Sequence, residues 1–528
     1  GLIPRFSRIF LGDKEFNKKR YAKHLKNVVN NKICSTCKGQ RLNSKILSSK
    51  IMSKNISDFT QMTIKENLEF LNKLEDPTAK YIIDPLKKQL EALEYIGLSY
   101  LTLNRVTTTL SGGEAQRLKL IRHLNSSLSD LVYIIDEPSV GLHPEDIAKI
   151  NEILKSLKEK GNTVLIVEHD PDVIKEGDYI IDMGPGSGKN GGEITFEGTY
   201  NELLSSNTST GNALRNKHNL KENIREANHF YNIGPVTQNN LNNVKTSIPK
   251  HVLTVLTGVA GSGKSTLVKA GFENNDHTIF IDQKAVQGSN RSNLLTYLGV
   301  FDSVRSYFSK ETGLNKAMFS YNSKGACPNC GGKGYIKTEL AFMGDFSQTC
   351  EVCHGKRYKQ EVLDATIDGY SIADVLNLTV DEGIIFFDKK NDIKSKLQSV
   401  SKTGLNYMSL GQPLSTLSGG EIQRVKLGQH LDEEIKNSIF IFDEPTTGLH
   451  ESDIPILMEC FDDLIDQNNT VILIEHNLSM MCEADWIIDV GPGPGLDGGK
   501  VQFSGTPKNF IDSSETLTSK HLKRYIKQ

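Results

Sequence analysis

The sequence contains two copies of one block of motifs, separated by a constant distance along the chain. Leu110–Arg117 reads Leu-Ser-Gly-Gly-Glu-Ala-Gln-Arg and returns at Leu417–Arg424 with a single change, Ile in place of Ala. Three further pairs keep the same offset of 307 positions: Asp136-Glu137-Pro138 with Asp443-Glu444-Pro445, His169 with His476, and Gly184-Pro185 with Gly491-Pro492. Four motifs at one offset indicate that the chain holds two copies of one module, a first copy and a second copy.

Each copy has the apolar pattern of an α/β fold. Continuous apolar runs with β-branched residues at 131–135 and 163–167, and their counterparts at 439–442 and 470–474, predict strands that are covered on both faces. The segments 144–160 and 452–468 alternate apolar and charged residues at helical spacing. This strand–helix–strand order predicts right-handed crossovers and a mainly parallel sheet in each copy.

One phosphate-binding loop is present, in the second copy. Residues 258–265 fit the pattern G-x-x-x-x-G-K-[ST], with a strand at 254–256 before it and a helix expected after it. Glycines let backbone N–H groups turn toward phosphate oxygens, and the following helix N-terminus favours their negative charge. The predicted nucleotide-binding set is Gly258, Gly261, Ser262, Gly263, Lys264, Ser265 and Thr266. Lys264 would reach the β- and γ-phosphates, and Ser265 would bind Mg²⁺.

Polar side chains downstream of this loop fit nucleotide hydrolysis. Asp443 ends a hydrophobic strand, where its carboxylate can hold the Mg²⁺ shell, and Glu444 can polarise the attacking water as a general base. His476 follows a second buried strand and is expected at the γ-phosphate. Gln283 follows the strand at 278–281 and is a candidate contact for the water and Mg²⁺. We therefore expect Lys264, Glu444 and His476 to be catalytic.

The order of these motifs resembles that of the ATP-binding cassette ATPases. In that family the signature serine and glycines of one cassette close over the ATP that is held by the other. The resemblance implies one complete site, in which the second copy's residues meet Ser111, Gly112, Gly113 and Glu114. It implies a second site from Asp136, Glu137, His169 and the signature residues Ser418, Gly419, Gly420 and Glu421, whose phosphate loop this chain does not contain.

Cysteine spacing predicts a structural zinc site. Cys327, Cys330, Cys350 and Cys353 form a C-x2-C-x19-C-x2-C arrangement, which suits a tetrahedral centre with four thiolate ligands. Disulfide or redox use is the alternative. Cys34 and Cys37 form a possible half site without a second pair, and Cys460 and Cys482 lie singly in apolar stretches. The chain opens without Met and without a basic-then-apolar leader, from which we expect a fragment of a cytoplasmic protein.

With this four-cysteine insert between the phosphate loop and the signature, the chain resembles the UvrA family of bacterial nucleotide excision repair over essentially its whole length. The segments that carry the resemblance are Cys34–Leu42, Leu101–Arg105, Asn239–Val244, Cys350–Tyr358 and Asp443–His450. The resemblance implies an ATPase of the excinuclease system that uses ATP, Mg²⁺ and Zn²⁺ and recognises damaged or distorted double-stranded DNA. It further implies a homodimer, and a UvrB partner whose binding domain is not in this chain.

Charge distribution is compatible with a nucleic-acid partner but does not select it. The formal net charge is only −2, yet residues 1–54 hold fourteen Lys or Arg against Asp13 and Glu15. Candidate phosphate contacts around the cysteine insert are Lys324, Lys333, Lys337, Lys356, Arg357 and Lys359. A solvated basic surface is the alternative for both groups.

Two other functions remain open. Ala341-Phe342-Met343-Gly344 departs from the repair proteins and is closer to UvrA-like paralogues that give resistance to DNA-intercalating drugs without UvrB. The ATPase subunit of a transporter is a different class, which the zinc insert and the lack of apolar runs long enough to span a membrane argue against.

Six segments are expected along the chain. They are an incomplete signature and zinc region of the first module (1–105), its ATPase core (106–205), a linker (206–232), the phosphate-loop lobe of the second module (233–300), a zinc-containing signature insert (301–405) and the second ATPase core (406–528). The fold class expected is α/β, with two tandem cassette ATPase modules that carry zinc-binding inserts.

Overall fold

A computed structural model describes residues 32–74, 76–110, 112–124, 128–216, 219–273, 275–284, 292–340, 344–433 and 435–527. The chain divides into two compact units. The smaller unit comprises Gly1–Leu90 and Leu101–Val106, and the larger unit comprises Glu91–Tyr100 and Thr107–Gln528. Within the described ranges, every helix falls short of the length and apolarity that a bilayer crossing requires.

The described part of the smaller unit is helical. The helices in this part are α4 (Ser44–Leu47), α5 (Ile56–Gln61), α6 (Ile64–Asn72) and most of α7 (Lys80–Tyr95). Asn55 and Thr63 begin α5 and α6 with capping boxes, in which the cap side chain and an acidic side chain three residues on satisfy each other's backbone N–H groups. Ile64, Leu68 and Leu71 are buried.

The second copy is built on a six-stranded sheet. The strand order is β16-β15-β7-β14-β13-β8, parallel throughout except for the antiparallel pair β15–β16. The elements of this copy outside its insert are β5 (Phe230–Gln238), β6 (Leu241–Pro249), β7 (Leu253–Thr257), α13 (Lys264–Phe272), β8 (Thr278–Ile281), α20 (Gly419–Leu431), β13 (Ile439–Asp443), α21 (Ile454–Asp466), β14 (Thr470–Ile474), α22 (Leu478–Cys482), β15 (Trp486–Gly491), β16 (Lys500–Gly505), α23 (Pro507–Ser513) and α24 (Leu517–Lys527).

This sheet is covered on both faces. Successive side chains of each strand point to opposite sides, so the inner strands β15, β7, β14 and β13 each contribute to two buried clusters. Ile439 and Ile441 of β13 pack in a cluster with side chains of β5, β6 and α13. Phe440 and Phe442 of the same strand pack in a second cluster with Phe461 of α21. The prediction of covered parallel strands is confirmed for this copy.

The first copy repeats the elements of the second copy from α20 onward, at the same offset. They are α8 (Gly112–Leu124), β1 (Val132–Asp136), α9 (Pro144–Glu159), β2 (Thr163–Val167), α10 (Pro171–Ile174), β3 (Ile180–Gly184), β4 (Glu193–Gly198), α11 (Tyr200–Ser205) and α12 (Ser209–Arg215). Even irregular features recur, since β3–β4 and β15–β16 share a register shift at Asp182 and Asp489, 307 positions apart. Helix α12 lies in the segment interpreted as a linker, and Thr208 caps its start.

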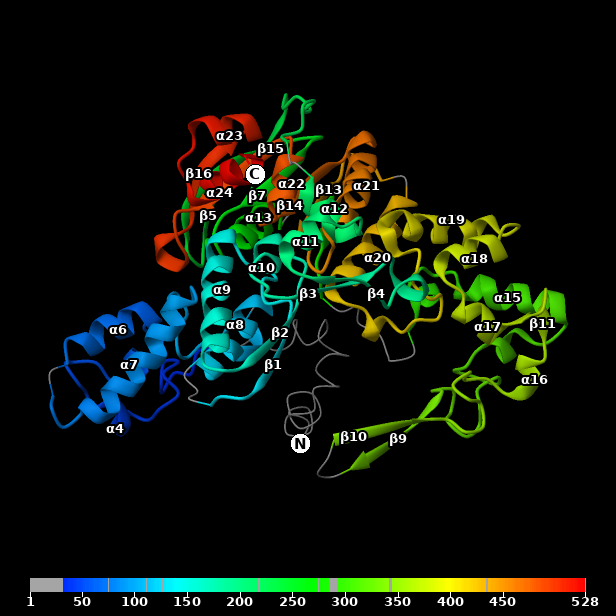
Figure 1. The fold of residues 1–528 in the computed structure, drawn as a ribbon, viewed down its shortest axis with the longest axis horizontal. Helices are drawn as coiled ribbons and strands as arrows, with labels where there is room; N and C mark the ends of the chain where they lie inside the picture. Colours follow the sequence, from blue (N-terminus) through cyan, green and yellow to red (C-terminus); the bar gives the residue numbers. More distant parts are fainter. Residues whose placement is uncertain are drawn as a thin grey trace. The chain divides into compact units, whose positions relative to one another are not determined.

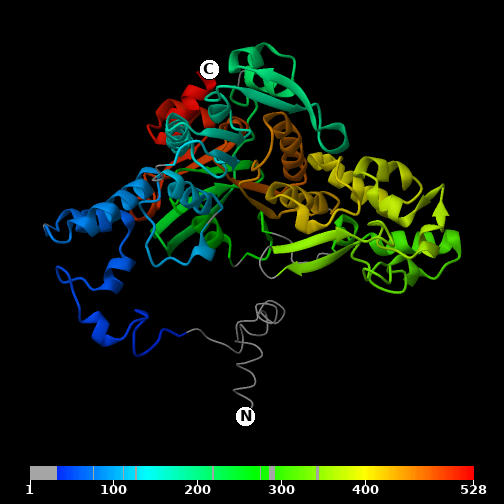
Figure 2. The same ribbon diagram turned by 60° about the horizontal axis from the view of Figure 1, so that its bottom comes forward.

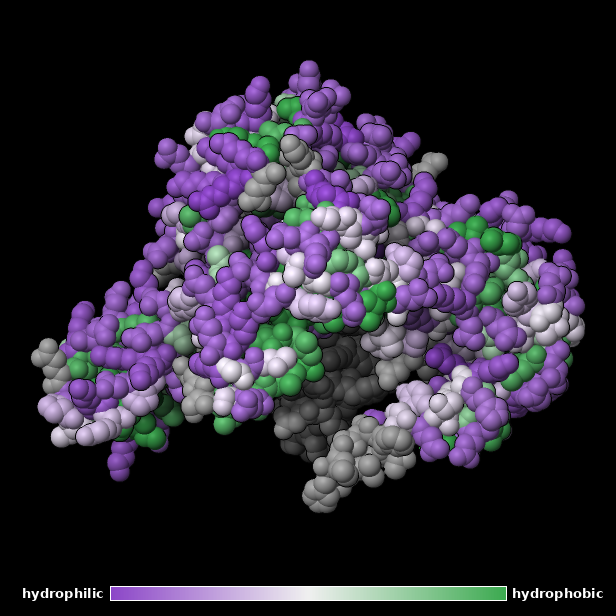
Figure 3. Space-filling model, viewed as in Figure 1, coloured by the Kyte–Doolittle hydropathy of each residue, from purple (hydrophilic) through white to green (hydrophobic). Residues whose placement is uncertain are grey.

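The prediction of strands covered on both faces is wrong for the first copy. Ile134 is 73% exposed, whereas its counterpart Ile441 is 1% exposed. The other exposed apolar side chains on β1, β2, β3 and β4 are Val132, Leu165, Val167, Ile181, Met183 and Ile194. Apolar surface gathers where β1 and β2 lie (Figure 3). The first copy forms two separate two-stranded sheets, β1–β2 and β3–β4, whereas β7 joins their counterparts. Because the chain has a single phosphate-loop lobe, no second lobe covers this face among the described residues.

The insert of the second copy lies between β8 and α20. It comprises α14 (Leu294–Tyr297), α15 (Phe301–Thr312), β9 (Tyr335–Leu340), β10 (Gly344–Thr349), α16 (Gln360–Leu363), β11 (Thr366–Ile367), β12 (Tyr370–Ser371), α17 (Ile372–Asn377), α18 (Val380–Phe386) and α19 (Asn391–Val400). Both ribbon views show these helices, green to yellow, as a lobe beside the six-stranded sheet (Figures 1 and 2). Phe308, Phe319 and Leu397 belong to its own buried core, which continues into α20.

Candidate composite nucleotide site

The phosphate loop has the backbone that its glycines predict. Gly258, Gly261 and Gly263 all have positive φ, a region that side chains with a Cβ rarely adopt. Lys264 begins α13 and is buried, and its Nζ donates hydrogen bonds to the carbonyl oxygens of Gly258 (2.8 Å) and Val259 (3.0 Å). Burial lowers the pKa of Lys264 to about 8, although the nearby carboxylates of Glu444, Asp489 and Asp443 favour its charged form.

The neighbouring residues of the loop line up with Asp443. The Ser265 hydroxyl lies 3.4 Å from Oδ1 of Asp443, so the two groups predicted to bind Mg²⁺ are adjacent. Thr266 accepts a hydrogen bond from Asn239 at 3.2 Å, and the Ser262 hydroxyl is buried without a protein partner. These residues fit a magnesium nucleotide, since hydroxyl and carboxylate oxygens are the ligands that Mg²⁺ takes.

Glu444 follows β13 with a left-handed backbone, φ +52°. This conformation, with a hydrogen bond from the Glu444 N–H to the Ile474 carbonyl (2.9 Å), turns the chain away from the strand. Burial, with the nearby carboxylates of Glu475 and Asp443, raises the pKa of Glu444 to about 7. A carboxyl group with a pKa near neutrality is suited to general base chemistry. Gln283 lies beside it and donates to the Glu444 carbonyl (3.0 Å) and the Thr447 hydroxyl (2.9 Å).

His476 is buried at the end of β14, and its Nδ1 has no protein hydrogen-bond partner. Burial lowers its pKa well below the ordinary value, so the ring is neutral. The preceding residue, Glu475, is also buried and accepts hydrogen bonds from the backbone N–H groups of His476 (2.6 Å) and Thr446 (3.1 Å). Glu475 therefore ties the strand end that carries His476 to the loop that follows Glu444.

The first copy places its counterparts in the same arrangement, but they are more exposed. Glu137 has φ +45° after β1, and its Oε1 lies 3.9 Å from Nε2 of His169. Asp136 ends β1, and its carbonyl accepts from Gln116 (2.5 Å). Burial raises the pKa of Glu137. The Asp–Glu–His set of the incomplete site is thus brought together by the same turns as in the complete one.

The two signature motifs begin helices α8 and α20. Ser418 caps α20 in a capping box with Glu421. A Cβ on Gly419 would lie 3.2 Å from Gln283 Oε1, and one on Gly420 would lie 2.4 Å from the Thr447 carbonyl, so both glycines permit close packing. In the first copy, Gly112 begins α8 and a Cβ on Gly113 would lie 3.0 Å from the Val140 carbonyl. Ser111 lies outside the described residues.

Tyr100 joins the first signature to the second copy's phosphate loop. Its hydroxyl donates to Oε1 of the signature residue Glu114 (2.6 Å), and a Cβ on Gly261 would lie 2.9 Å from its ring. Tyr407 and Glu421 repeat the bond at 2.8 Å, with Tyr407 against Gly188 of the first copy. This reciprocal contact supports the head-to-tail pairing of copies that the resemblance implies.

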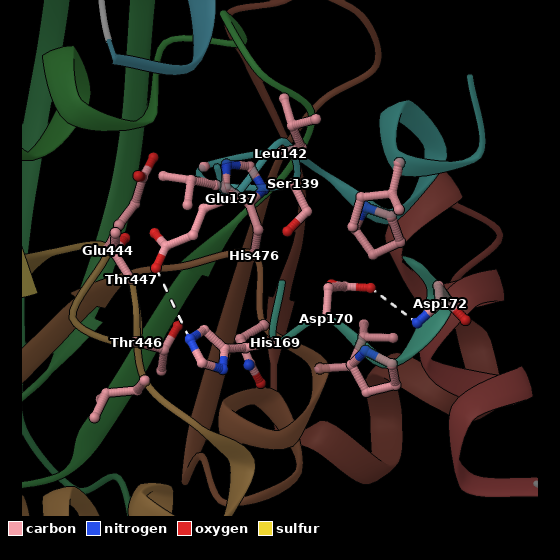
Figure 4. A pocket seen from close by; sticks show the side chains of 18 of the residues that line it. Glu137, Ser139, Leu142, His169, Asp170, Asp172, Glu444, Thr446, Thr447 and His476 are labelled. Atoms are coloured by element: carbon pink, nitrogen blue, oxygen red, sulfur yellow. Dashed lines mark hydrogen bonds and ion pairs between the residues drawn. The ribbon is translucent and has the colours of Figure 1, made fainter. Parts of the chain in front are cut away.

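The site glutamates and site histidines of both copies line one cavity of about 160 Å³. Glu137 and His169 of the first copy lie around it with Glu444 and His476 of the second (Figure 4). The loops after the two glutamates cross, since a Cβ on Gly141 would lie 2.8 Å from Glu444 and one on Gly448 would lie 3.4 Å from Glu137.

The cysteines of the insert form a tetrad. The Sγ atoms of Cys327, Cys330, Cys350 and Cys353 all lie within 4.8 Å of one another, and all four residues are buried. Zn–S bonds of about 2.3 Å in a tetrahedron place sulfur atoms about 3.8 Å apart, and the measured pairs are 4.0 Å (Cys327–Cys350) and 3.7 Å (Cys330–Cys353). The N–H of Gly334 donates to Sγ of Cys330. The donor set fits a zinc ion.

The remaining predicted groups are less complete. Among the described residues, the tetrad is the one group of three or more His, Cys, Asp or Glu side chains close enough to share a metal ion, so Cys34 and Cys37 stay a half site. Cys460 and Cys482 are buried in the core, as expected. Lys356 pairs with Asp374 (3.6 Å) and the Arg357 guanidinium lies 5.5 Å from the Tyr321 ring centroid, so these two cations already contact the insert. Most of the basic segment 1–54 lies outside the described residues.

Sequence reasoning gave no role to several residues that contact the site. Tyr100, His143, Thr518 and Asp489 belong to this group. A signal was available for some of them, because Tyr100 and Tyr407, His143 and His450, and Asp182 and Asp489 all recur at the offset of 307. The histidines and tyrosines of these pairs contact residues of the other copy, which a periodic pattern does not reveal.

Known proteins share this arrangement. A family model described as ABC transporter matches residues 241–447. UvrABC system protein A from Clostridium perfringens is 42% identical over 93% of this chain and 57% of the relative. The protein of that name from Aquifex aeolicus is 40% identical over 100% of this chain and 61% of the relative. The chain thus spans about three fifths of the length of these relatives.

A solved structure extends the match to the fold. The crystal structure of UvrA2 from Deinococcus radiodurans superposes with a TM-score of 0.90 at 35% identity, covering 98% of this chain and 69% of that one. This agreement covers two thirds of the solved chain, and with the paired cassettes and the cysteine tetrad it identifies the family. The chain belongs to the UvrA family.

Proposed function

We propose that this chain is the part of a UvrA-type protein that binds and hydrolyses ATP at one complete composite site and couples it to recognition of damaged or distorted double-stranded DNA in nucleotide excision repair. The observation that carries the ATPase part is the convergence of Asp443, Glu444 and the buried Lys264 at the phosphate loop, with Tyr100 linking the signature Glu114 to that loop. Zinc would fold the insert, and Mg²⁺ would be held by Ser265 and Asp443.

The proposed reaction uses groups whose positions suit it. Lys264 and the loop N–H groups would neutralise the β- and γ-phosphates, and Glu444 would accept a proton from the attacking water. Gln283 and His476 would contact the water and the γ-phosphate. Family membership and the free thiols of the tetrad favour the reducing cytoplasm as the compartment.

DNA is the proposed partner because residues 324–359, around the cysteine tetrad, hold six Lys or Arg against three Asp or Glu, and because the relatives belong to the UvrABC system. A homodimer is proposed on the family resemblance alone. UvrB is proposed as a partner of the whole protein on the same ground. The drug-resistance paralogue is a second candidate, because the sequence Ala341-Phe342-Met343-Gly344 departs from the repair proteins.

The test compares DNA affinities of the chain and of its Lys264→Ala variant, with and without Mg²⁺-ATP. Lesion-bearing, drug-intercalated and undamaged duplexes of one sequence would be titrated across a range of salt concentrations. The proposal expects binding that weakens with salt, prefers one modified duplex, and loses its response to ATP in the variant. A preference for the intercalated duplex would favour the paralogue. Equal affinity for all three duplexes, or an ATP response that survives Lys264→Ala, would refute the proposal.

A further inference from the structure

A chain of hydrogen bonds runs from the loop of the first copy into the sheet of the second. His143, the residue before α9, accepts a hydrogen bond at Nδ1 from the N–H of Glu145 (3.2 Å). A neutral imidazole that accepts at Nδ1 carries its hydrogen on Nε2. Nε2 lies 3.1 Å from the Thr518 hydroxyl, so His143 donates there, and Thr518 donates in turn to Oδ1 of Asp489 (3.3 Å).

A second chain of hydrogen bonds runs in the opposite direction, from the second copy into the first. His450 of the second copy lies 307 positions after His143 and accepts at Nδ1 from the Ser452 N–H (3.2 Å). Its Nε2 lies 3.1 Å from the Thr210 hydroxyl of the first copy, which donates to Oδ1 of Asp182 (2.7 Å). Two relays of His, Thr and Asp therefore link the copies reciprocally, and their recurrence argues against an incidental contact.

All three members of the first relay are buried. The exposed fractions are 0% for His143, 1% for Thr518 and 2% for Asp489. Burial lowers the pKa of His143 to about 3, which keeps the ring neutral as its hydrogen bonds require. An imidazole, a hydroxyl and a carboxylate removed from water are stable only when they satisfy one another, so the docking geometry is closely specified.

Each relay histidine also packs against the other copy's site histidine. The rings of His143 and His476 meet edge to face with centroids 5.9 Å apart, and those of His450 and His169 do so at 6.2 Å. Two residues before His143, the backbone of Gly141 approaches the Glu444 carboxylate so closely that a Cβ would lie 2.8 Å from Oε2. His143, the first member of this relay, therefore stands at the end of a loop that contacts both Glu444 and His476.

The other end of this relay adjoins the phosphate loop. Asp489 lies on β15, and a Cβ on Gly258 would lie 3.1 Å from its Oδ1 and 2.0 Å from the Val490 carbonyl. Thr518 donates to that same Oδ1. One buried chain of polar groups therefore spans from the loop beside Glu444 to the first glycine of the phosphate loop.

We propose that His143 is a positioning residue for the complete site, acting through Thr518 and Asp489 to hold the first copy's loop 139–142 against Glu444 and His476. This proposal rests on the ATPase function proposed above. Without the relay, the nucleotide still binds the second copy's phosphate loop, but Glu444 and His476 lose the surface that fixes them for attack on the γ-phosphate. Turnover at the second copy's site thereby depends on the first copy.

The test replaces Thr518 by Val, which keeps the shape of the buried side chain and removes its hydroxyl. Thr518→Ser restores the hydroxyl, and Thr403→Val removes a buried hydroxyl that bonds only to the Val400 carbonyl outside the site. Measurements are kcat for ATP hydrolysis, the dissociation constant of a fluorescent ATP analogue, and hydrogen–deuterium exchange of peptides covering 139–147. We expect Thr518→Val to lower kcat about tenfold or more, because small misplacement of catalytic groups is costly.

The same variant should leave nucleotide affinity within about twofold, since the phosphate loop keeps its own ligands. Exchange at 139–147 should quicken in Thr518→Val, return to the wild-type rate in Thr518→Ser and stay unchanged in Thr403→Val. A wild-type kcat in Thr518→Val, or a Ser variant as impaired as the Val variant, would overturn the relay. If the wild-type chain hydrolyses no ATP, the proposed function fails, and unchanged exchange at 139–147 in Thr518→Val then overturns the relay separately.

Discussion

Individual side chains in this protein show how two copies of one motif diverge. Asp170 follows His169 and caps α10 by accepting from the Asp172 N–H (2.9 Å). Burial, with the carboxylates of Asp172 and Glu168, raises the pKa of Asp170 to about 7. The second copy has Asn477 at the matching position, where its amide oxygen caps α22 by accepting from the Met480 N–H (3.2 Å). An uncharged cap therefore serves the same turn.

Asp170→Asn should stabilise the protein, and more so at high pH. Because the folded-state pKa is raised above the ordinary 3.8, the cost of burying the charge is absent at low pH and grows until the pH passes about 7. Thermal unfolding should show a melting temperature about 2–4 °C higher at pH 8 and a smaller gain at pH 5. The matched variant Asn477→Asp should be destabilised, and more so at pH 8 than at pH 5. Equal gains at both pH values would contradict this assignment of the charge.

At this scale the sequence predicted which motif residues lie together, whereas their binding of a nucleotide stays a prediction. Lys264, Asp443 and Glu444 belong to short motifs whose chemistry is local, and the structure brings them together. The contact between His143 and Thr518 could not be predicted, because it joins residues 375 positions apart on different copies. Local pattern specifies which backbone a residue adopts, whereas the partner of a buried polar group is decided by docking.

Secondary-structure elements follow the internal repeat closely, and one insert breaks it. The cysteine tetrad stands in a segment between β8 and α20, and its sulfur atoms are buried with their own hydrogen-bond donors. A four-thiolate zinc site contributes folding free energy to a small insert of this kind.

Cys350→Ser should therefore release one zinc ion per chain and loosen the insert. The zinc content can be measured by plasma mass spectrometry, and limited proteolysis should show new cleavage within 292–405. Cys482→Ala is the matched control, because Cys482 is buried in the sheet core away from the tetrad. Unchanged zinc content in Cys350→Ser would refute the four-cysteine site.

The sequence predicts that a strand forms more reliably than it predicts whether other elements bury that strand. The strands at β1 and β13 were both predicted from apolar runs, and both exist. Their burial differs because, among the described residues, the second copy alone has β7 to complete its sheet and β5, β6 and α13 packed against that sheet. An apolar run indicates a strand that can be covered on both faces, but it does not supply the lobe that covers it.

Across the whole molecule, this asymmetry makes paired substitutions informative. Ile134 is 73% exposed, whereas Ile441, at the same place in the second copy, is 1% exposed. Ile134→Lys should change the free energy of unfolding by less than about 0.5 kcal/mol. Ile441→Lys should cost about 3 kcal/mol or more, because a buried ammonium group has no partner there. Urea denaturation of both variants checks the contrast, and equal losses would mean that the first sheet is covered in solution.

The two copies also predict how many nucleotides one chain holds. Its sequence contains one phosphate loop, and the structure sets the first copy's Tyr100 against that loop. The second set of Asp136, Glu137 and His169 has no loop of its own among the described residues. The central claim is therefore one complete ATP site for each chain, assembled from both copies.

The most direct measurement is the stoichiometry of Mg²⁺-ATP binding by calorimetry. The Glu444→Gln variant would be used, because loss of the proposed general base prevents turnover during the titration. We predict one tight site per chain, which disappears when Lys264→Ala is added. Two tight sites per chain, or a single site that persists in the Lys264→Ala background, would contradict the account.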